Sequence, residues 1–164
     1  MAPPMKIYVI LHNVRSAHNV GAIFRTADGA GVSKIFLTGY TPAPVDRFGR
    51  PRTALEKTAL GATDSVPWEV CEDAPVLVSR LQREGIEIVS VEQHEQAISY
   101  TEQAFTRDAA FIFGNEVEGV PEALSLVADA IVHIPMHGKK ESLNVSTTAG
   151  IILFHAIQPS LNRT

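Results

Sequence analysis

The chain has 164 residues, 45% of them hydrophobic, which fits one globular domain with its own core and excludes a disordered chain or a repeat protein. The only cysteine is Cys71, so an internal disulfide is excluded. The apolar runs are too short for a membrane span or a secretory signal. We therefore expect a cytoplasmic protein with no membrane partner. The net charge of −4 argues against a protein that coats nucleic acid nonspecifically. The charge is unevenly distributed, because residues 1–57 carry eight Lys or Arg against three acids and residues 58–138 carry three against fourteen. This distribution allows a local basic face.

Short apolar runs rich in β-branched residues alternate with helix-like stretches along the chain. This alternation is typical of βα units on a parallel sheet, so the predicted class is α/β. Strands are predicted at residues 6–11, 34–38, 86–91, 110–113 and 130–134, and helices at 19–30, 53–60, 73–84, 121–127 and 144–157. Residues 39–51 combine prolines, glycines and arginines, which predicts an irregular basic loop. No linker or composition break divides the chain, so we expect a single domain over residues 1–164.

The first dense polar segment, residues 13–28, lies where a strand ends and a helix begins near Asn19. Ligands of open α/β sheets bind outside the carboxyl ends of strands, so this junction is a candidate site. Gly21 and Arg25 are four residues apart and share a helix face, where the missing side chain of Gly21 would let a ligand approach the guanidinium. The alternative is that Asn19 caps a helix and Arg25 makes a surface ion pair.

The second segment, residues 111–121, carries a buried strand into a turn before Pro121 opens a helix. Gly114 and Gly119 have the spacing of a P-loop, but no Lys-Ser/Thr pair follows them, and no GxGxxG sequence follows any strand. Glu116 lies between these glycines at the carboxyl end of the strand. It is either a placed functional group or a solvated turn residue.

The third segment, residues 134–146, joins the last strand to the last helix. Ser142 and Asn144 offer small polar groups, and the irregular backbone around Gly138 exposes N–H and C=O groups that could hold an adenine or a ribose. Taken singly, Asn144 is equally well explained as a helix N-cap and Ser142 as a solvated loop residue.

All three segments follow predicted strands, so we expect them at one rim of the sheet. Their motifs resemble those of the SpoU (TrmH-like) branch of the SPOUT methyltransferases. The matching residues are NVG at 19–21 with Arg25, GNEVEG at 114–119, and IPM at 134–136 with SLNVS at 142–146. The resemblance extends from about residue 7 to residue 157.

This resemblance implies a parallel-sheet α/β fold with a C-terminal trefoil knot, a homodimer, and S-adenosyl-L-methionine as the methyl donor. The implied reaction is methylation of a ribose 2′-hydroxyl in tRNA or rRNA. We expect no additional RNA-binding domain of the kind that many members carry. By motif matching, the expected catalytic residues are Asn19, Arg25, Glu116, Ser142 and Asn144, and the expected cofactor pocket is the backbone around Val91, Gly114, Ile134, Met136 and Leu143.

The acidic middle of the chain limits where RNA could bind, so we expect a local basic surface. Its candidates are Arg15, Arg25, Arg47, Arg50, Arg52, Lys57, Lys139 and Lys140. Apolar stripes on the first and last helices could extend a core across a two-fold interface, consistent with the expected homodimer.

Within the implied mechanism, a guanidinium holds its proton too strongly for Arg25 to act as an efficient base. We therefore expect Arg25, oriented by Asn19 and Glu116, to hold a ribose phosphate and stabilise the developing alkoxide, with the proton acceptor left open. Ser142 and Asn144 would fix the loop and the hydroxyl. No metal is expected, because no cysteine or carboxylate set accompanies His133 and His137.

Two alternative functions are compared with this one. A non-catalytic RNA-binding scaffold would not need Arg25, Glu116 and Asn144 together. A dinucleotide-dependent oxidoreductase is disfavoured by the missing phosphate-binding glycine motif.

Overall fold

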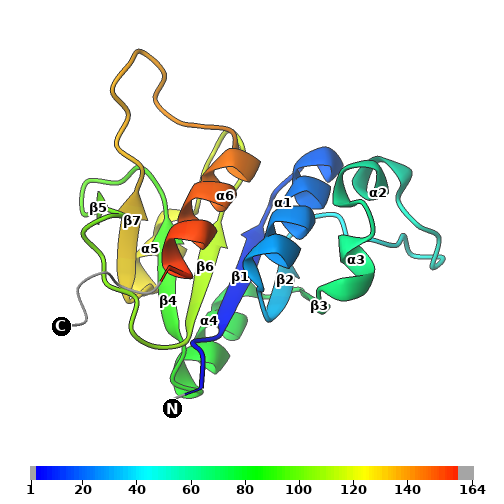
Figure 1. Cartoon of the computed structure of the whole chain (residues 1–164), viewed down its shortest axis with the longest axis horizontal. Coiled ribbons are helices and arrows are strands. Elements are labelled where there is room, and N and C mark those ends of the chain that lie inside the picture. Colours follow the sequence, from blue (N-terminus) through cyan, green and yellow to red (C-terminus); the bar gives the residue numbers. More distant parts are fainter. Residues whose placement is uncertain (1–2, 159–164) are drawn as a thin grey trace.

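The computed structural model describes residues 3–158, in which a parallel sheet of seven strands lies between two layers of helices (Figure 1). The strands are β1 (Ile7–His12), β2 (Lys34–Thr38), β3 (Trp68–Cys71), β4 (Glu87–Val91), β5 (Ile98–Ser99), β6 (Ala109–Phe113) and β7 (Ala130–His133). The helices are α1 (Ala17–Ala30), α2 (Thr53–Ala59), α3 (Ala62–Ser65), α4 (Ala74–Arg83), α5 (Glu122–Val127) and α6 (Val145–Ala156). This architecture confirms the predicted α/β class.

Alternation of apolar side chains along the central strands gives the sheet two buried faces. On one face, Val9 of β1 and Phe111 of β6 belong to a core that includes residues of α1, α2 and α6. On the other face, Ile10 and Ile112 of the same strands belong to a core with α4 and α5. The helices therefore cover both faces and leave the strand ends as the place for a site.

The strand order is β3-β2-β1-β6-β4-β7-β5, and every neighbouring pair is parallel. The carboxyl ends of β1, β4, β6 and β7 therefore lie along one edge of the sheet. β7 lies between β4 and β5, which follow each other in the sequence, so the C-terminal half of the sheet is interleaved. The trefoil knot implied by the family resemblance stays a prediction.

The first helix begins earlier than predicted. Ser16 is its N-cap, and the Ser16 side chain accepts a hydrogen bond of 3.2 Å from the backbone N–H of Asn19. Asn19 is therefore inside the helix, and the interpretation of Asn19 as the cap is wrong. Serine and asparagine cap helices about equally well, so the sequence did not separate the two positions.

Candidate active site

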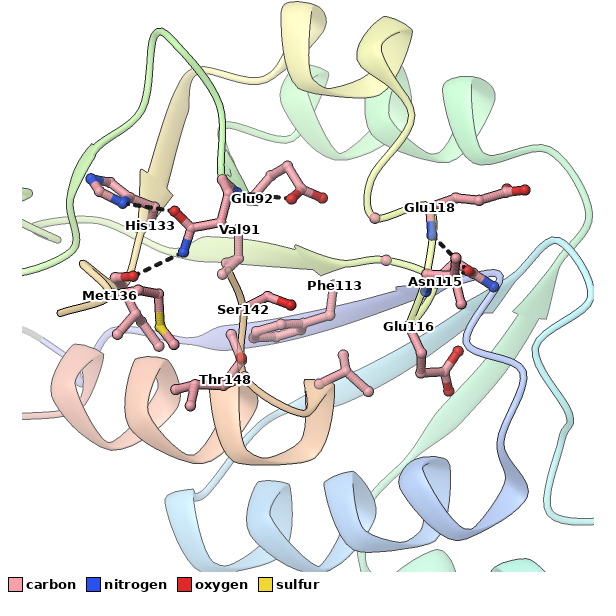
Figure 2. Close-up of a pocket in the computed structure, with 17 residues that line it drawn as sticks. Val91, Glu92, Phe113, Asn115, Glu116, Glu118, His133, Met136, Ser142 and Thr148 are labelled. Carbon is pink, nitrogen blue, oxygen red and sulfur yellow. Dashed lines mark hydrogen bonds between the residues drawn. The ribbon is translucent and has the colours of Figure 1, made fainter. Parts of the chain in front are cut away.

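A cleft opens at the carboxyl ends of β4, β6 and β7 and is closed on one side by the start of α6 (Figure 2). Every residue expected to form the cofactor pocket lines this cleft, and so do Glu116 and Ser142 from the catalytic set. The full lining consists of Val91, Glu92, Gln93, Phe113, Gly114, Asn115, Glu116, Val117, Glu118, Gly119, His133, Ile134, Met136, Ser142, Leu143, Val145 and Thr148.

The turn after β6 is tight because its two glycines leave no room for side chains. A Cβ on Gly114 would collide with the backbone of Gly119, and a Cβ on Gly119 would collide with the carboxylate of Glu92. Gly119 also has a φ of +72°, which disfavours other residues. Inside the turn, Asn115 Oδ1 accepts from the N–H groups of Val117 at 2.8 Å and Glu118 at 2.9 Å. The turn thus brings its backbone close to the cleft without being a phosphate loop.

The carboxylate of Glu116 joins this turn to the start of α1, toward which Figure 2 shows it pointing. Its Oε1 accepts from Ser16 N–H and from Asn19 Nδ2, each at 3.1 Å, and its Oε2 accepts from Arg15 N–H at 3.1 Å. Asn144 Nδ2 then donates to Asn19 Oδ1 at 3.3 Å. Glu116, Asn19 and Asn144 therefore form one hydrogen-bonded chain that ties the three motifs together.

Partial burial by itself would raise the pKa of Glu116, but the hydrogen bonds from Asn19 and from the backbone N–H groups of Ser16 and Arg15 outweigh it and lower the pKa. The group is therefore ionised at neutral pH, and its oxygens are already occupied by donors. This arrangement suits a positioning residue better than a proton acceptor.

Asn144 is also the N-cap of α6, where its Oδ1 accepts from the N–H of Ser146 at 2.9 Å. The simple explanation of Asn144 as a helix cap is therefore right, and its amide nitrogen has the additional role of contacting Asn19. Ser142 lies two residues before this cap and lines the cleft.

Two lining residues that directly follow β4, Glu92 and Gln93, were not predicted from the sequence. Glu92 Oε2 accepts from Val120 N–H at 2.6 Å, and Glu92 Oε1 accepts from Gln93 N–H at 2.8 Å. Gln93 Nε2 donates to the carbonyl oxygen of Ile134 at 2.9 Å, and Gln93 Oε1 lies 3.1 Å from His133 Nδ1. The pair thus ties the glycine turn and the strand before α6 to the end of β4. Their position at a strand's carboxyl end is the signal that could have found them.

Arg25 lies apart from the cleft. It is exposed on α1 in a shallow depression that it shares with Lys57, Leu60 and Phe154. Within residues 3–158, Arg25 makes no hydrogen bond and no ion pair, so the expectation that Asn19 and Glu116 of the same chain orient it is wrong.

The prediction that Gly21 lets a ligand approach Arg25 is also wrong. A Cβ there would collide with the carbonyl oxygen of Leu55 and with Thr58 Oγ1. The glycine therefore admits α2 against α1 rather than a ligand beside Arg25.

The basic residues proposed for RNA binding are distributed over separate parts of the surface. Arg15 is exposed beside the cleft, and Lys57 shares the depression around Arg25. Arg47, Arg50 and Arg52 lie in the predicted irregular loop between β2 and α2, and Lys139 and Lys140 lie in the loop between β7 and α6. Figure 1 shows these loops, cyan to teal at the right and orange at the top, projecting in different directions. The basic set is therefore not one continuous patch.

Within the described part of the chain, no group of three His, Cys, Asp or Glu residues is arranged to hold a metal ion. Among residues 3–158, no helix combines the length and apolar character needed to cross a membrane.

Comparisons with known proteins identify similar chains. Residues 6–154 match the SpoU rRNA Methylase family. The 23S rRNA (guanosine-2′-O-)-methyltransferase RlmB of Ralstonia nicotianae is 32% identical over 156 residues, which make up 95% of this chain and 59% of that protein. The AdoMet-bound rRNA methyltransferase structure from Sinorhizobium meliloti is 29% identical, with a TM-score of 0.83 over 94% of this chain and 56% of that one. The TrmH/SpoU tRNA modifying enzyme of A. aeolicus is 28% identical, with a TM-score of 0.81 over 93% of this chain and 74% of that one. The chain thus spans about three fifths of the curated relative.

Proposed function

The chain belongs to the SpoU rRNA methylase family, and we propose that it transfers a methyl group from S-adenosylmethionine to a ribose 2′-hydroxyl of tRNA or rRNA in the cytoplasm. Family membership confirms the resemblance carried by the three motifs. The observation that carries the proposed activity is the cleft, which gathers Val91, Gly114, Ile134, Met136 and Leu143 together with Glu116 and Ser142.

The residues of the cleft fit S-adenosylmethionine. Met136 and Leu143 offer apolar surface for an adenine, and the absence of side chains at Gly114 and Gly119 brings polar backbone groups beside it. When bound, this cofactor supplies a methyl group activated by an adjacent sulfonium.

The residues of the chain then have distinct roles in the proposed reaction. Glu116, Asn19 and Asn144 hold the loop before α6 against the start of α1, which keeps Ser142 at the cleft. Ser142 orients the ribose hydroxyl, and positioning of this kind supplies much of the rate in a transfer reaction. Arg25 holds a phosphate and stabilises negative charge that develops on the ribose oxygen.

Arg25 can take this role if it works on the cleft of a second copy. It lies outside its own cleft, in a depression where Leu60 is 65% exposed and Phe154 45%. Exposed apolar side chains at this density favour burial against a partner. The apolar stripes expected to form a two-fold interface are instead buried in the chain's own core, because α1 and α6 pack on the sheet and on each other. We therefore propose a homodimer formed through the exposed outer faces of α1 and α6, with the Arg25 of one protomer completing the site of the other.

Calorimetry with S-adenosylhomocysteine tests the cofactor assignment, and mapping of 2′-O-methyl groups in tRNA and rRNA from cells lacking the protein tests the reaction. We expect binding of S-adenosylhomocysteine and the loss of one or more methylated riboses. A protein that binds RNA but not S-adenosylhomocysteine, and whose loss leaves the methylation map unchanged, is instead a non-catalytic RNA-binding scaffold.

A further inference from the structure

The loop that joins β2 to α2 is held in a defined shape by Asp46. Asp46 Oδ1 accepts from the N–H groups of Phe48 at 2.8 Å and Arg50 at 3.0 Å, and Oδ2 accepts from Arg50 Nε at 2.9 Å. The backbone N–H of Asp46 also donates to the carbonyl oxygen of Arg50 at 2.8 Å, and Gly49 turns the chain with a φ of +78°. A loop with this many internal hydrogen bonds presents its side chains in a fixed arrangement.

At the tip of this loop, Phe48 is 66% exposed. The guanidinium carbons of Arg47 and Arg50 lie 4.7 Å and 5.0 Å from the centre of the Phe48 ring. Exposing a phenyl ring to water has no stabilising effect on the fold, and the ring here is flanked by two cations rather than by apolar neighbours. An exposed ring beside two cations suits an external partner with a flat surface and negative charge.

We propose that Phe48, Arg47 and Arg50 form a stacking site for an unpaired nucleotide of the RNA substrate, separate from the nucleotide that is methylated. This inference rests on the proposed function, since it takes RNA as the substrate. A base offers a flat π-face to the phenyl ring or to a guanidinium plane, and its phosphate pairs with the guanidinium groups. Within the described residues, Arg47 makes no ion pair and Arg50 pairs with Asp46 through Nε, so donors remain for a phosphate.

The loop connects this tip to the cleft. At the start of the loop, the hydroxyl of Tyr40 accepts a 2.8 Å hydrogen bond from Asn115 Nδ2, and Asn115 belongs to the turn that lines the cleft. Figure 1 shows the loop extending from there beyond α2, to the side of the molecule opposite β7. An RNA held at Phe48 would thus be anchored at a distance from the reacting ribose, which predicts an effect on RNA binding and not on chemistry.

The test compares Phe48→Ala, Phe48→Leu and Phe48→Trp with the wild-type protein. The probe is a short fluorescent single-stranded RNA, with a duplex of the same sequence as a second probe. We expect Phe48→Ala and Phe48→Leu to weaken binding of the single strand roughly tenfold, and Phe48→Trp to retain it, because base stacking needs an aromatic ring and not apolar volume alone. The duplex should be less affected, because its bases are already stacked on one another.

The salt dependence of RNA affinity distinguishes the contribution of base stacking from that of phosphate contacts. Phe48→Ala should leave the slope of affinity against salt concentration unchanged, whereas Arg47→Ala should make the slope shallower by removing a phosphate contact. The proposal is overturned if Phe48→Leu binds the single strand as tightly as the wild type, or if all three variants lose binding together with thermal stability.

The same variants distinguish this proposal from the proposed function. A wild-type protein that binds S-adenosylhomocysteine, with a Phe48→Ala variant that binds RNA normally, contradicts the stacking site alone. A wild-type protein that binds no S-adenosylhomocysteine but loses single-strand binding with Phe48→Ala contradicts the methyl transfer alone. A wild-type protein that binds S-adenosylhomocysteine but neither RNA probe contradicts the stacking site alone, and one that binds none of the three contradicts both.

Discussion

The carboxylate of Glu116 accepts hydrogen bonds from three donors at the start of α1, although it belongs to the turn after β6. A carboxylate next to the N-terminus of a helix also interacts favourably with the helix dipole. Both effects favour the ionised form, in agreement with the lowered pKa. The hydrogen bonds that Glu116 accepts from the start of α1 are therefore strongest when the carboxylate is ionised.

This linkage predicts a pH-dependent contribution to stability. A group whose folded-state pKa is depressed stabilises the fold above its unfolded pKa, and that stability is lost as pH falls from the ordinary value of 4.5 through the lowered one. We expect Glu116→Gln to be less stable than wild type at neutral pH, by no more than about 1 kcal/mol because the carboxylate is exposed to solvent. The difference should shrink below pH 4.5. Urea unfolding of both proteins across this pH range measures it, and a difference independent of pH would contradict it.

The second prediction at this scale concerns the effect of Glu92 on cofactor binding. Its two oxygens each accept one backbone hydrogen bond, whereas a glutamine at this position can accept only through its single oxygen and turns an NH₂ group toward a backbone donor. We expect Glu92→Gln to weaken binding of S-adenosylhomocysteine roughly tenfold, the size of a lost charge-assisted hydrogen bond, with little change in kcat at saturating cofactor.

Glu118→Gln is the matched control, because Glu118 also lines the cleft but its side chain makes no hydrogen bond within the described residues. It removes the same charge and should bind S-adenosylhomocysteine like the wild type in calorimetry. Equal losses in both variants would mean that charge in the cleft, and not the position of the turn, sets the affinity.

At the scale of elements, hydrophobic periodicity predicted the central strands of the sheet and the helices that cover them. It missed β3, β5 and α3. β3 is an edge strand with partly exposed residues, and β5 and α3 have only two and four residues, so none has a clear apolar pattern. The rule that ligands bind at the carboxyl ends of strands predicted that the three polar segments share one rim of the sheet. The individual site residues were predicted from the resemblance to the SpoU family. Glu92 and Gln93 satisfy the same rule, but a carboxylate and an amide after a strand are indistinguishable in sequence from solvated loop residues. Gly21 was misread because its neighbour, α2, is distant in sequence.

Because Gly21 allows α1 and α2 to pack closely, a methyl group added at this position should destabilise the protein. Gly21→Ala should destabilise the protein by about 1–3 kcal/mol, because its Cβ would collide with Leu55 O and Thr58 Oγ1 of α2. Gly29→Ala on the same helix is the control: its Cβ would meet only Phe154 at an ordinary 3.5 Å, so the higher helix propensity of alanine should make it neutral or stabilising. Thermal unfolding compares the two. A Gly21→Ala protein as stable as Gly29→Ala would show that α2 is not held this closely.

At the scale of the whole molecule, Arg25 lies apart from its own cleft, so the proposed reaction requires the proposed homodimer. Light scattering at micromolar concentration should give a dimer, and a monomer would contradict the proposed interface. Arg25→Ala should bind S-adenosylhomocysteine normally while losing activity by about 10² to 10³, as expected when one group that stabilises transition-state charge is removed.

A mixed dimer tests whether Arg25 acts on the partner. Arg25→Ala and Met136→Trp are co-expressed with different tags, the second variant being chosen because a tryptophan at Met136 should fill the cleft and abolish S-adenosylhomocysteine binding. If each site takes its cleft from one protomer and its arginine from the other, one of the two sites in a mixed dimer is intact, and purified mixed dimers should recover about half of the wild-type activity. If Arg25 serves its own cleft, both sites are defective, because one lacks the arginine and the other lacks the cofactor. Activity no higher than that of the parent variants would therefore overturn the shared site, whereas recovery would account for an essential arginine that lies outside the cleft of its own chain.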